Sequence, residues 1–146
     1  MEINNLKDNI INNISNNNNC ITKLNFYEKE YIIKAFDTHS SIITEIQDLI
    51  KDIHKNNTFD YHDIPHIILT ITTIFSNYLL YNNNIDPYNI IKFITECIIF
   101  SYFTSVTEAE IVIIDKVMTI SIDLIKVSPN IFKSKCNCFS FCKKRN

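Results

Sequence analysis

The stretch that decides the fold lies at residues 25–54 and reads NFYEKEYIIKAFDTHSSIITEIQDLIKDIH. Apolar residues and one histidine recur here at alternating spacings of four and three, which is the spacing of one helix face. We call this set the apolar seam, and its members are Ile32, Phe36, His39, Ile43, Ile46, Ile50 and Ile53. The pattern predicts either one long helix or two helices that break near residues 37–41, because Asp, Thr and Ser favour helix caps over helix interiors.

Three further helices are expected after the seam. A polar loop over residues 55–61 precedes an apolar periodic run that has Pro65 in its first turn, where a missing backbone N–H is tolerated. Asp86 followed by Pro87 is typical of a helix start. Each of these two starts is followed by isoleucines at helical spacing, so both runs are expected to bury one face.

The last expected helix begins with a capping box. Thr107 is followed three residues later by Glu110, the pattern in which each side chain bonds the other residue's backbone N–H. Apolar residues over 118–124 also alternate, as they would in a strand. The helix is favoured because the run is about 20 residues long, whereas strands average about five or six.

The beginning of the chain gives a weaker signal. Leu6, Ile10 and Ile14 have helical spacing, but residues 1–22 are rich in Asn, a poor helix former. We therefore interpret residues 1–22 as a marginal helix or a disordered lead. The overall expectation is an all-α protein, with a bundle of four to five helices over residues 23–130 and a flexible tail over residues 131–146.

The composition excludes several classes of enzyme. The 146 residues include 30 Ile and 20 Asn but no Gly, a bias that indicates an A/T-rich genome such as that of a large DNA virus. Phosphate-binding loops, dinucleotide fingerprints and the nucleophile elbow all need Gly. We therefore expect a protein that is not an enzyme and has no cofactor.

The expected location is intracellular. The first residues carry acids and many Asn where a secretory signal needs a basic start and an apolar run, so secretion is not expected. No run of about 20 apolar residues predicts a membrane span. The odd number of cysteines, five, argues against a disulfide framework, and Cys97 is interpreted as an inert core residue.

Residues 131–146, which we call the basic tail, read IFKSKCNCFSFCKKRN and differ from the rest of the chain. All 16 acidic residues precede the basic tail, whereas five of the 14 basic residues lie within it. Its basic residues are Lys133, Lys135, Lys143, Lys144 and Arg145; its aromatic residues include Phe139 and Phe141; and its thiols are Cys136, Cys138 and Cys142. Basic groups bind anionic lipid head groups, Phe rings insert at the interface and cysteines accept acyl chains. The basic tail is therefore a candidate membrane anchor with S-acylation sites.

Other interpretations of the basic tail remain open. It can be a solvated segment without a binding role. Its three thiols are weak metal candidates, because a closed zinc site needs four ligands. Nucleic acid is disfavoured as a partner, since the acidic remainder of the chain would repel phosphates. A second weak metal candidate is the pair His62 and His66, which lacks a third ligand.

The composition, size and all-helical pattern resemble those of accessory proteins from A/T-rich large DNA viruses. Some poxvirus proteins of this kind have a small helical Bcl-2-like fold and bind host signalling proteins. The motif of the cellular members of that fold requires Gly and Trp, and this sequence contains neither. The resemblance therefore covers composition and helix count only, and it assigns no site residues.

Three functions follow from these patterns as hypotheses. The first is a non-enzymatic helical accessory or adaptor protein that the basic tail tethers to the cytosolic side of an intracellular membrane. The second is a soluble interaction module, with an unknown protein partner or a homodimer formed through the apolar seam. The third is a metal-binding protein that uses the tail thiolates.

Overall fold

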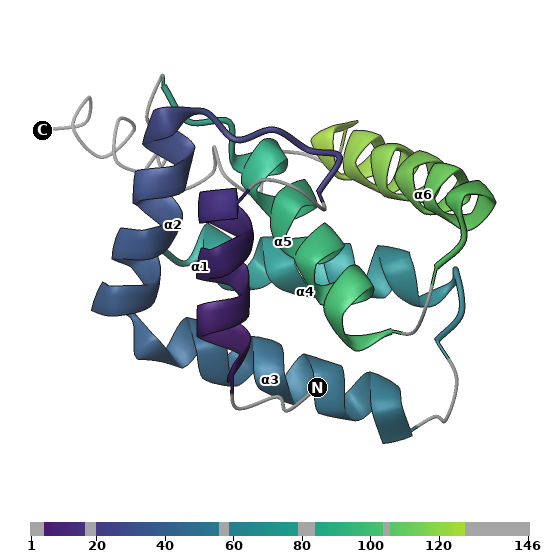
Figure 1. Cartoon of the computed structure of the whole chain (residues 1–146), viewed down its shortest axis with the longest axis horizontal. Coiled ribbons are helices and arrows are strands. Elements are labelled where there is room, and N and C mark those ends of the chain that lie inside the picture. The colour runs from purple at the N-terminus through teal and green to yellow at the C-terminus, as the bar shows by residue number, and fades with distance from the viewer. Residues whose placement is uncertain (1–4, 17–19, 56–58, 79–83, 104–105, 128–146) are drawn as a thin grey trace, which may run out of the picture.

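The computed structural model describes residues 5–16, 20–55, 59–78, 84–103 and 106–127, and the basic tail lies outside these ranges. The described residues form an all-α bundle of six helices (Figure 1). The helices are α1 (Leu6–Asn16), α2 (Phe26–Thr38), α3 (Ser40–Lys55), α4 (Asp63–Ser76), α5 (Pro87–Tyr102) and α6 (Glu108–Val127). The expected fold class is confirmed, with one or two helices more than the four to five expected.

The apolar seam runs through two helices that break at His39. The His39 backbone N–H still bonds the Ala35 carbonyl oxygen at 2.8 Å, and α3 begins at the next residue. Of the two expected arrangements, the broken one is therefore observed. Its physical basis is local, because the Asp-Thr-His-Ser-Ser run offers little support to a helix interior.

The expected marginal lead forms a helix, α1. Leu6, Ile10 and Ile14 are almost completely buried, and α1 packs against α2, α3 and α5. Burial of an apolar face therefore outweighs the low helix propensity of Asn in this segment. The lead is part of the bundle over the residues that the structure describes.

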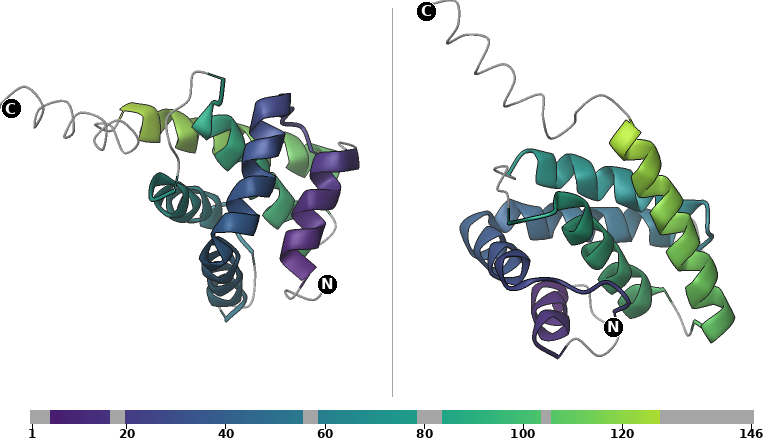
Figure 2. Two further views of the ribbon diagram at one scale, coloured as in Figure 1. Left: turned by 90° about the vertical axis from the view of Figure 1, so that its left-hand side faces the viewer. Right: turned by 90° about the horizontal axis from the view of Figure 1, so that it is seen from above.

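α5 lies in the middle of the molecule, and α6 lies across one side (Figure 2). α5 contacts α1, α4 and α6. Every residue from Ile90 to Ile99 is buried except Lys92. A helix that is apolar on all sides must be covered on all sides. α5 is therefore covered on its several sides, chiefly by α1, α4 and α6.

The expected helix starts are confirmed. The Asp86 side chain accepts a hydrogen bond from the Tyr88 backbone N–H at 2.9 Å, and Pro87 occupies the first turn. In α6, the Thr107 N–H donates to the Glu110 carboxylate at 2.7 Å, and the Glu110 N–H donates to the Thr107 hydroxyl at 3.3 Å. These reciprocal bonds satisfy backbone donors that a helix terminus otherwise leaves free.

Glu28 connects the starts of two helices. Its carboxylate is 3% exposed and forms a capping box with Asn25 at the beginning of α2. The same carboxylate accepts hydrogen bonds from the Asp86 backbone N–H at 3.2 Å and from the Asn89 side-chain amide at 2.8 Å. Four donors thus compensate a buried charge, and the beginning of α5 is fixed beside that of α2.

Candidate functional site

The exposed face of α6 is the largest set of large apolar side chains that one described helix leaves in water. We call Ile113, Ile120, Leu124 and Val127 the outer stripe. At 100° per residue these four positions fall within a sector of about 60° of the helix. Their exposed fractions rise along the helix, from 43% at Ile113 through 60% and 66% to 84% at Val127.

The opposite side of α6 is buried in the bundle. Ile114, Met118 and Ile122 pack into the core, where α6 contacts α4 and α5. α6 therefore has two apolar faces, and the structure of this chain covers one of them. Exposed apolar patches on monomeric proteins mark surfaces for partners, membranes or ligands.

The outer stripe leads directly to the basic tail, whose first residue follows Val127 by four positions. The predicted tail residues Cys136, Cys138, Cys142, Lys133, Lys135, Lys143, Lys144, Arg145, Phe139 and Phe141 lie outside the described residues. The structure therefore describes the surface next to the basic tail, and the membrane attachment of the tail itself stays a prediction. Sequence reasoning missed the stripe, although its signal was present in apolar residues on both sides of this helix.

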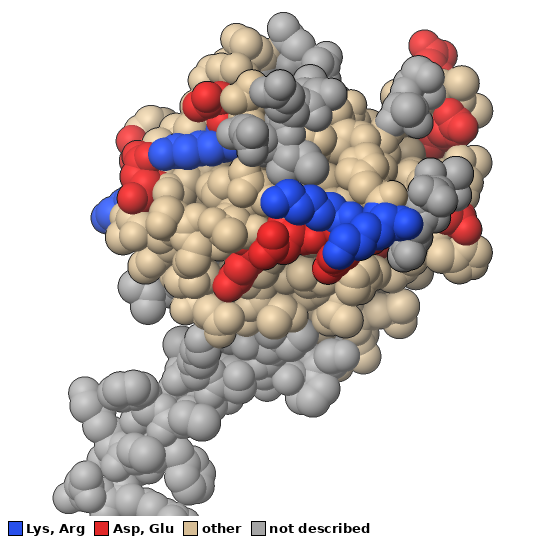
Figure 3. All heavy atoms as spheres, turned by 90° about the horizontal axis from the view of Figure 1, so that it is seen from below, with Lys and Arg blue, Asp and Glu red and all other residues tan. Residues whose placement is uncertain are grey.

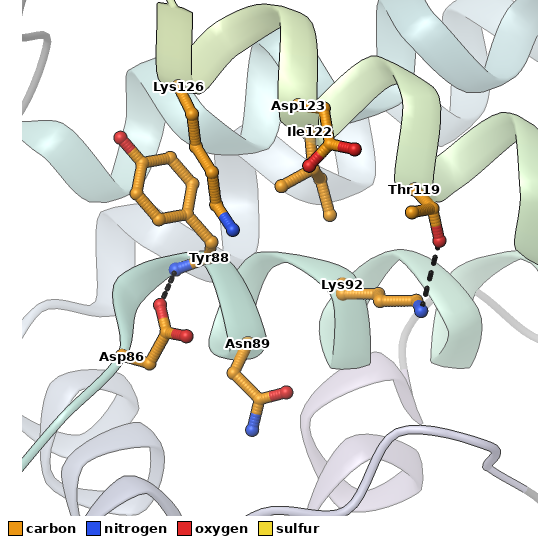
Figure 4. A pocket seen from close by; sticks show the side chains of 8 residues that line it. All are labelled: Asp86, Tyr88, Asn89, Lys92, Thr119, Ile122, Asp123 and Lys126. Atoms are coloured by element: carbon orange, nitrogen blue, oxygen red, sulfur yellow. Dashed lines mark hydrogen bonds between the residues drawn. The ribbon is translucent and has the colours of Figure 1, made fainter.

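A shallow pocket lies between α5 and α6 (Figure 4). It holds about 150 Å³, whereas ligand pockets usually hold about 300–1,000 Å³. The Lys126 ammonium lies 5.1 Å from the centre of the Tyr88 ring, and Lys92 Nζ lies 2.8 Å from Asp115 Oδ1. Both lysines of the pocket are thus engaged within the protein, and the pocket helps to fasten α6 to α5.

A buried polar pair joins the segment before α2 to the middle of α5. Glu96 is fully buried, and its carboxylate accepts hydrogen bonds from the backbone N–H of Thr22, at 3.1 Å, and from the Thr22 hydroxyl. Burial raises the pKa of Glu96 above its usual value, and the two Thr22 hydrogen bonds and Lys92 partly oppose the rise. The two residues lie 74 positions apart, so no local pattern predicts the pair.

The two thiols beside this pair are also in contact. Cys20 Sγ lies 3.7 Å from Cys97 Sγ, and both residues are buried. The expected core position of Cys97 is confirmed by its burial, and its expected inertness stays a prediction. Its contact with a second thiol is a new feature.

The apolar seam lies mostly in the core of this chain. Its members Ile32, Phe36, Ile46, Ile50 and Ile53 are buried, Ile43 is half-buried and His39 is exposed. The His39 ring lies against the Tyr78 ring, with centroids 4.6 Å apart. The five buried side chains are not available to a second copy in the folded bundle, and homodimer formation itself stays a prediction.

The histidine pair lies at the beginning of α4. His62 and His66 are exposed, and His62 Nδ1 lies 3.0 Å from Asp60 Oδ2. The hydrogen bond with His62 lowers the pKa of Asp60. Within the described ranges, no three His, Cys, Asp or Glu residues form a group that could hold a metal ion.

On the face that Figure 3 shows, acidic and basic side chains lie beside one another, and neither sign of charge forms a separate patch.

Among the helices of the described ranges, none is both long enough and apolar enough to cross a membrane.

Comparison with known proteins adds no assignment. No protein-family model matches the sequence, and no curated protein or solved structure is significantly similar to the chain.

Proposed function

We propose that this chain is a non-enzymatic helical accessory or adaptor protein that attaches to an anionic membrane surface on the cytosolic side. The outer stripe of α6 and the basic tail together form the attachment surface. The observation that carries the proposal is the rise in exposure along the stripe, which is greatest at Val127, next to the basic tail.

The stripe has the chemistry of an interfacial helix. Such helices lie in the membrane plane with an apolar face buried at the boundary between head groups and acyl chains. In the half of α6 nearest the tail, the charged residues Asp123 and Lys126 line the pocket with α5, to one side of the stripe. At 100° per residue, Lys126 lies about 100° from Val127 and the exposed Asp123 lies about 40° from it. Lys126 therefore faces away from the stripe, and Asp123 lies at its edge.

The basic tail supplies the complementary part. Each Lys or Arg near an anionic surface contributes about 1 kcal/mol, so its five basic residues provide electrostatic attraction that the acidic remainder of the chain lacks. Aromatic rings and two or more acyl chains would make the attachment stable. The other faces of the bundle would then be free to bind a protein partner.

Replacement of the tail thiols tests the acylation step. In eukaryotic cells, we expect the chain with Cys136, Cys138 and Cys142 changed to Ser to move from the membrane fraction to the cytosol and to lose hydroxylamine-sensitive acyl groups. A matched control changes Ser134 and Ser140, in the same segment, to Ala, and it should stay with the membranes. Equal membrane recovery of both variants would reject acylation.

The competing soluble function has its own signature. If a second copy covers the outer stripe, the purified chain should have a dimer mass in solution, and this mass should fall to that of a monomer when the stripe is made polar. If tail thiolates bind zinc, reduced native protein should contain stoichiometric metal. Neither result is expected from the membrane proposal.

A further inference from the structure

Two cysteines from distant parts of the chain meet inside the bundle. Cys20 lies in the segment between α1 and α2, and Cys97 lies in the middle of α5, 77 positions later. Their sulfur atoms are 3.7 Å apart, and the residues are 6% and 2% exposed. A disulfide has a sulfur–sulfur distance of about 2.05 Å, so a closure of less than 2 Å would join them.

Hydrogen bonds close to the two cysteines hold residues 22 and 23 against α5. Thr22 bonds Glu96 through both its backbone N–H and its hydroxyl. The Asn89 side chain donates a hydrogen bond to the Lys23 carbonyl oxygen at 2.9 Å. The segment is thus fastened to α5 on the side of Cys20 that leads to α2. Residues 20–25 are not helical, so a small rotation at Cys20 need not break a helix.

The two thiols are chemically unequal. Either thiol can donate in this contact, and the hydrogen bond with Cys97 lowers the pKa of Cys20. Contact with Cys20, together with burial, raises the pKa of Cys97 well above its usual value. Since the thiolate is the nucleophile in disulfide exchange, these opposite directions favour Cys20 as the first sulfur to react.

We propose that Cys20 and Cys97 form an oxidation site, in which a low-molecular-weight disulfide such as oxidised glutathione converts the two thiols into one reversible cross-link. The Cys20 thiolate attacks a glutathione sulfur, forms a mixed disulfide and releases one glutathione thiolate. The Cys97 thiolate then attacks the Cys20 sulfur and releases the second. Two protein thiols and one oxidised glutathione thus become one protein disulfide and two reduced glutathione molecules.

The cross-link would fasten the α1 end of the bundle to its central helix. In the reduced protein, α1 is held by noncovalent packing, chiefly through Leu6, Ile10 and Ile14. The disulfide would close a loop of nearly 80 residues, and cross-links that close long loops restrict the unfolded chain most. Intracellular disulfides are usually transient and redox-sensing, which fits a reversible site.

The test uses the full chain with Cys136, Cys138 and Cys142 changed to Ser, so that only the two inner thiols remain. The native protein is equilibrated in glutathione buffers of graded redox ratio, starting from both reduced and oxidised protein. Intact mass after alkylation and non-reducing peptide mapping identify the products. Cys20→Ala and Cys97→Ala versions of the same chain serve as controls.

We expect one intramolecular Cys20–Cys97 disulfide, reversed by reduced glutathione, and a rise of the thermal midpoint on the order of 10 °C on oxidation. Neither control should form a protein disulfide or show this rise, and Cys97→Ala should stop at the mixed disulfide of Cys20 with glutathione. The proposal is overturned if native protein keeps both thiols in excess oxidised glutathione or stops at a mixed disulfide. It is also overturned if the oxidised protein melts below the reduced one.

Discussion

Replacement of the three most exposed residues of the outer stripe by Gln, as Ile120→Gln, Leu124→Gln and Val127→Gln together, should weaken membrane binding without unfolding the bundle. Full burial of an aliphatic side chain is worth about 2 kcal/mol. The three residues are 60%, 66% and 84% exposed, a mean of 70%, so full transfer of their exposed surface would contribute about 4 kcal/mol.

An interfacial helix removes only part of this surface from water. If about half of it enters the interface, the loss on substitution is about 2 kcal/mol, which corresponds to a roughly 30-fold lower partition coefficient. Gln is chosen because it is a good helix former. The exposed positions should therefore tolerate it, and the helical circular dichroism and the thermal midpoint should change little.

The assay is flotation of the purified full-length chain with vesicles of phosphatidylcholine that contain phosphatidylserine. The matched control is Val112→Gln, because Val112 is 54% exposed on the same helix but lies about 100° from Ile113. It should bind as the wild type does. Equal binding of the triple variant and the wild type would refute the role of the stripe, and equal weakening by both substitutions would show that its position does not matter.

Three further changes test the bundle itself. Glu28→Ala should lower the free energy of unfolding by about 3 kcal/mol, because it removes a cap and strands the Asp86 and Asn89 donors; urea unfolding measures this loss, and a change below about 1 kcal/mol would contradict the bonding described. Burial raises the pKa of Glu96 in the folded state above its usual 4.5, so its favourable contribution is complete below that value and is lost as the pH rises through the raised pKa. Relative to the wild type, the urea midpoint of Glu96→Gln should therefore rise as the pH increases from below 4.5 through the raised pKa, and a difference that stays constant with pH would exclude the linkage. Thr107→Ala should cost about 1 kcal/mol through loss of the α6 cap, and an unchanged thermal midpoint would argue against that cap.

The helix starts could be predicted because their chemistry is local. Asp86 with Pro87 and Thr107 with Glu110 were recognised from a few neighbouring residues, and the structure shows their hydrogen bonds. The break at His39 was one of two expected arrangements for the same reason. Each of these signals depends only on residues within about one turn of helix.

Features that depend on distant contacts could not be predicted. α1 is stabilised because its apolar face packs against α5. No local pattern in an Asn-rich segment predicts that contact. The contacts of Thr22 with Glu96 and of Cys20 with Cys97 join positions 74 and 77 apart. Nor does the sequence reveal which of the two apolar faces of α6 the bundle covers.

The most direct test of the account compares the full-length chain with a version that ends at Asn130 in eukaryotic cells, with membranes separated from cytosol. Both forms keep all six helices and the outer stripe, so the comparison isolates the basic tail. We predict that the full-length form sediments with membranes and that the shortened form is largely cytosolic. If both forms remain in the cytosol, membrane attachment is wrong.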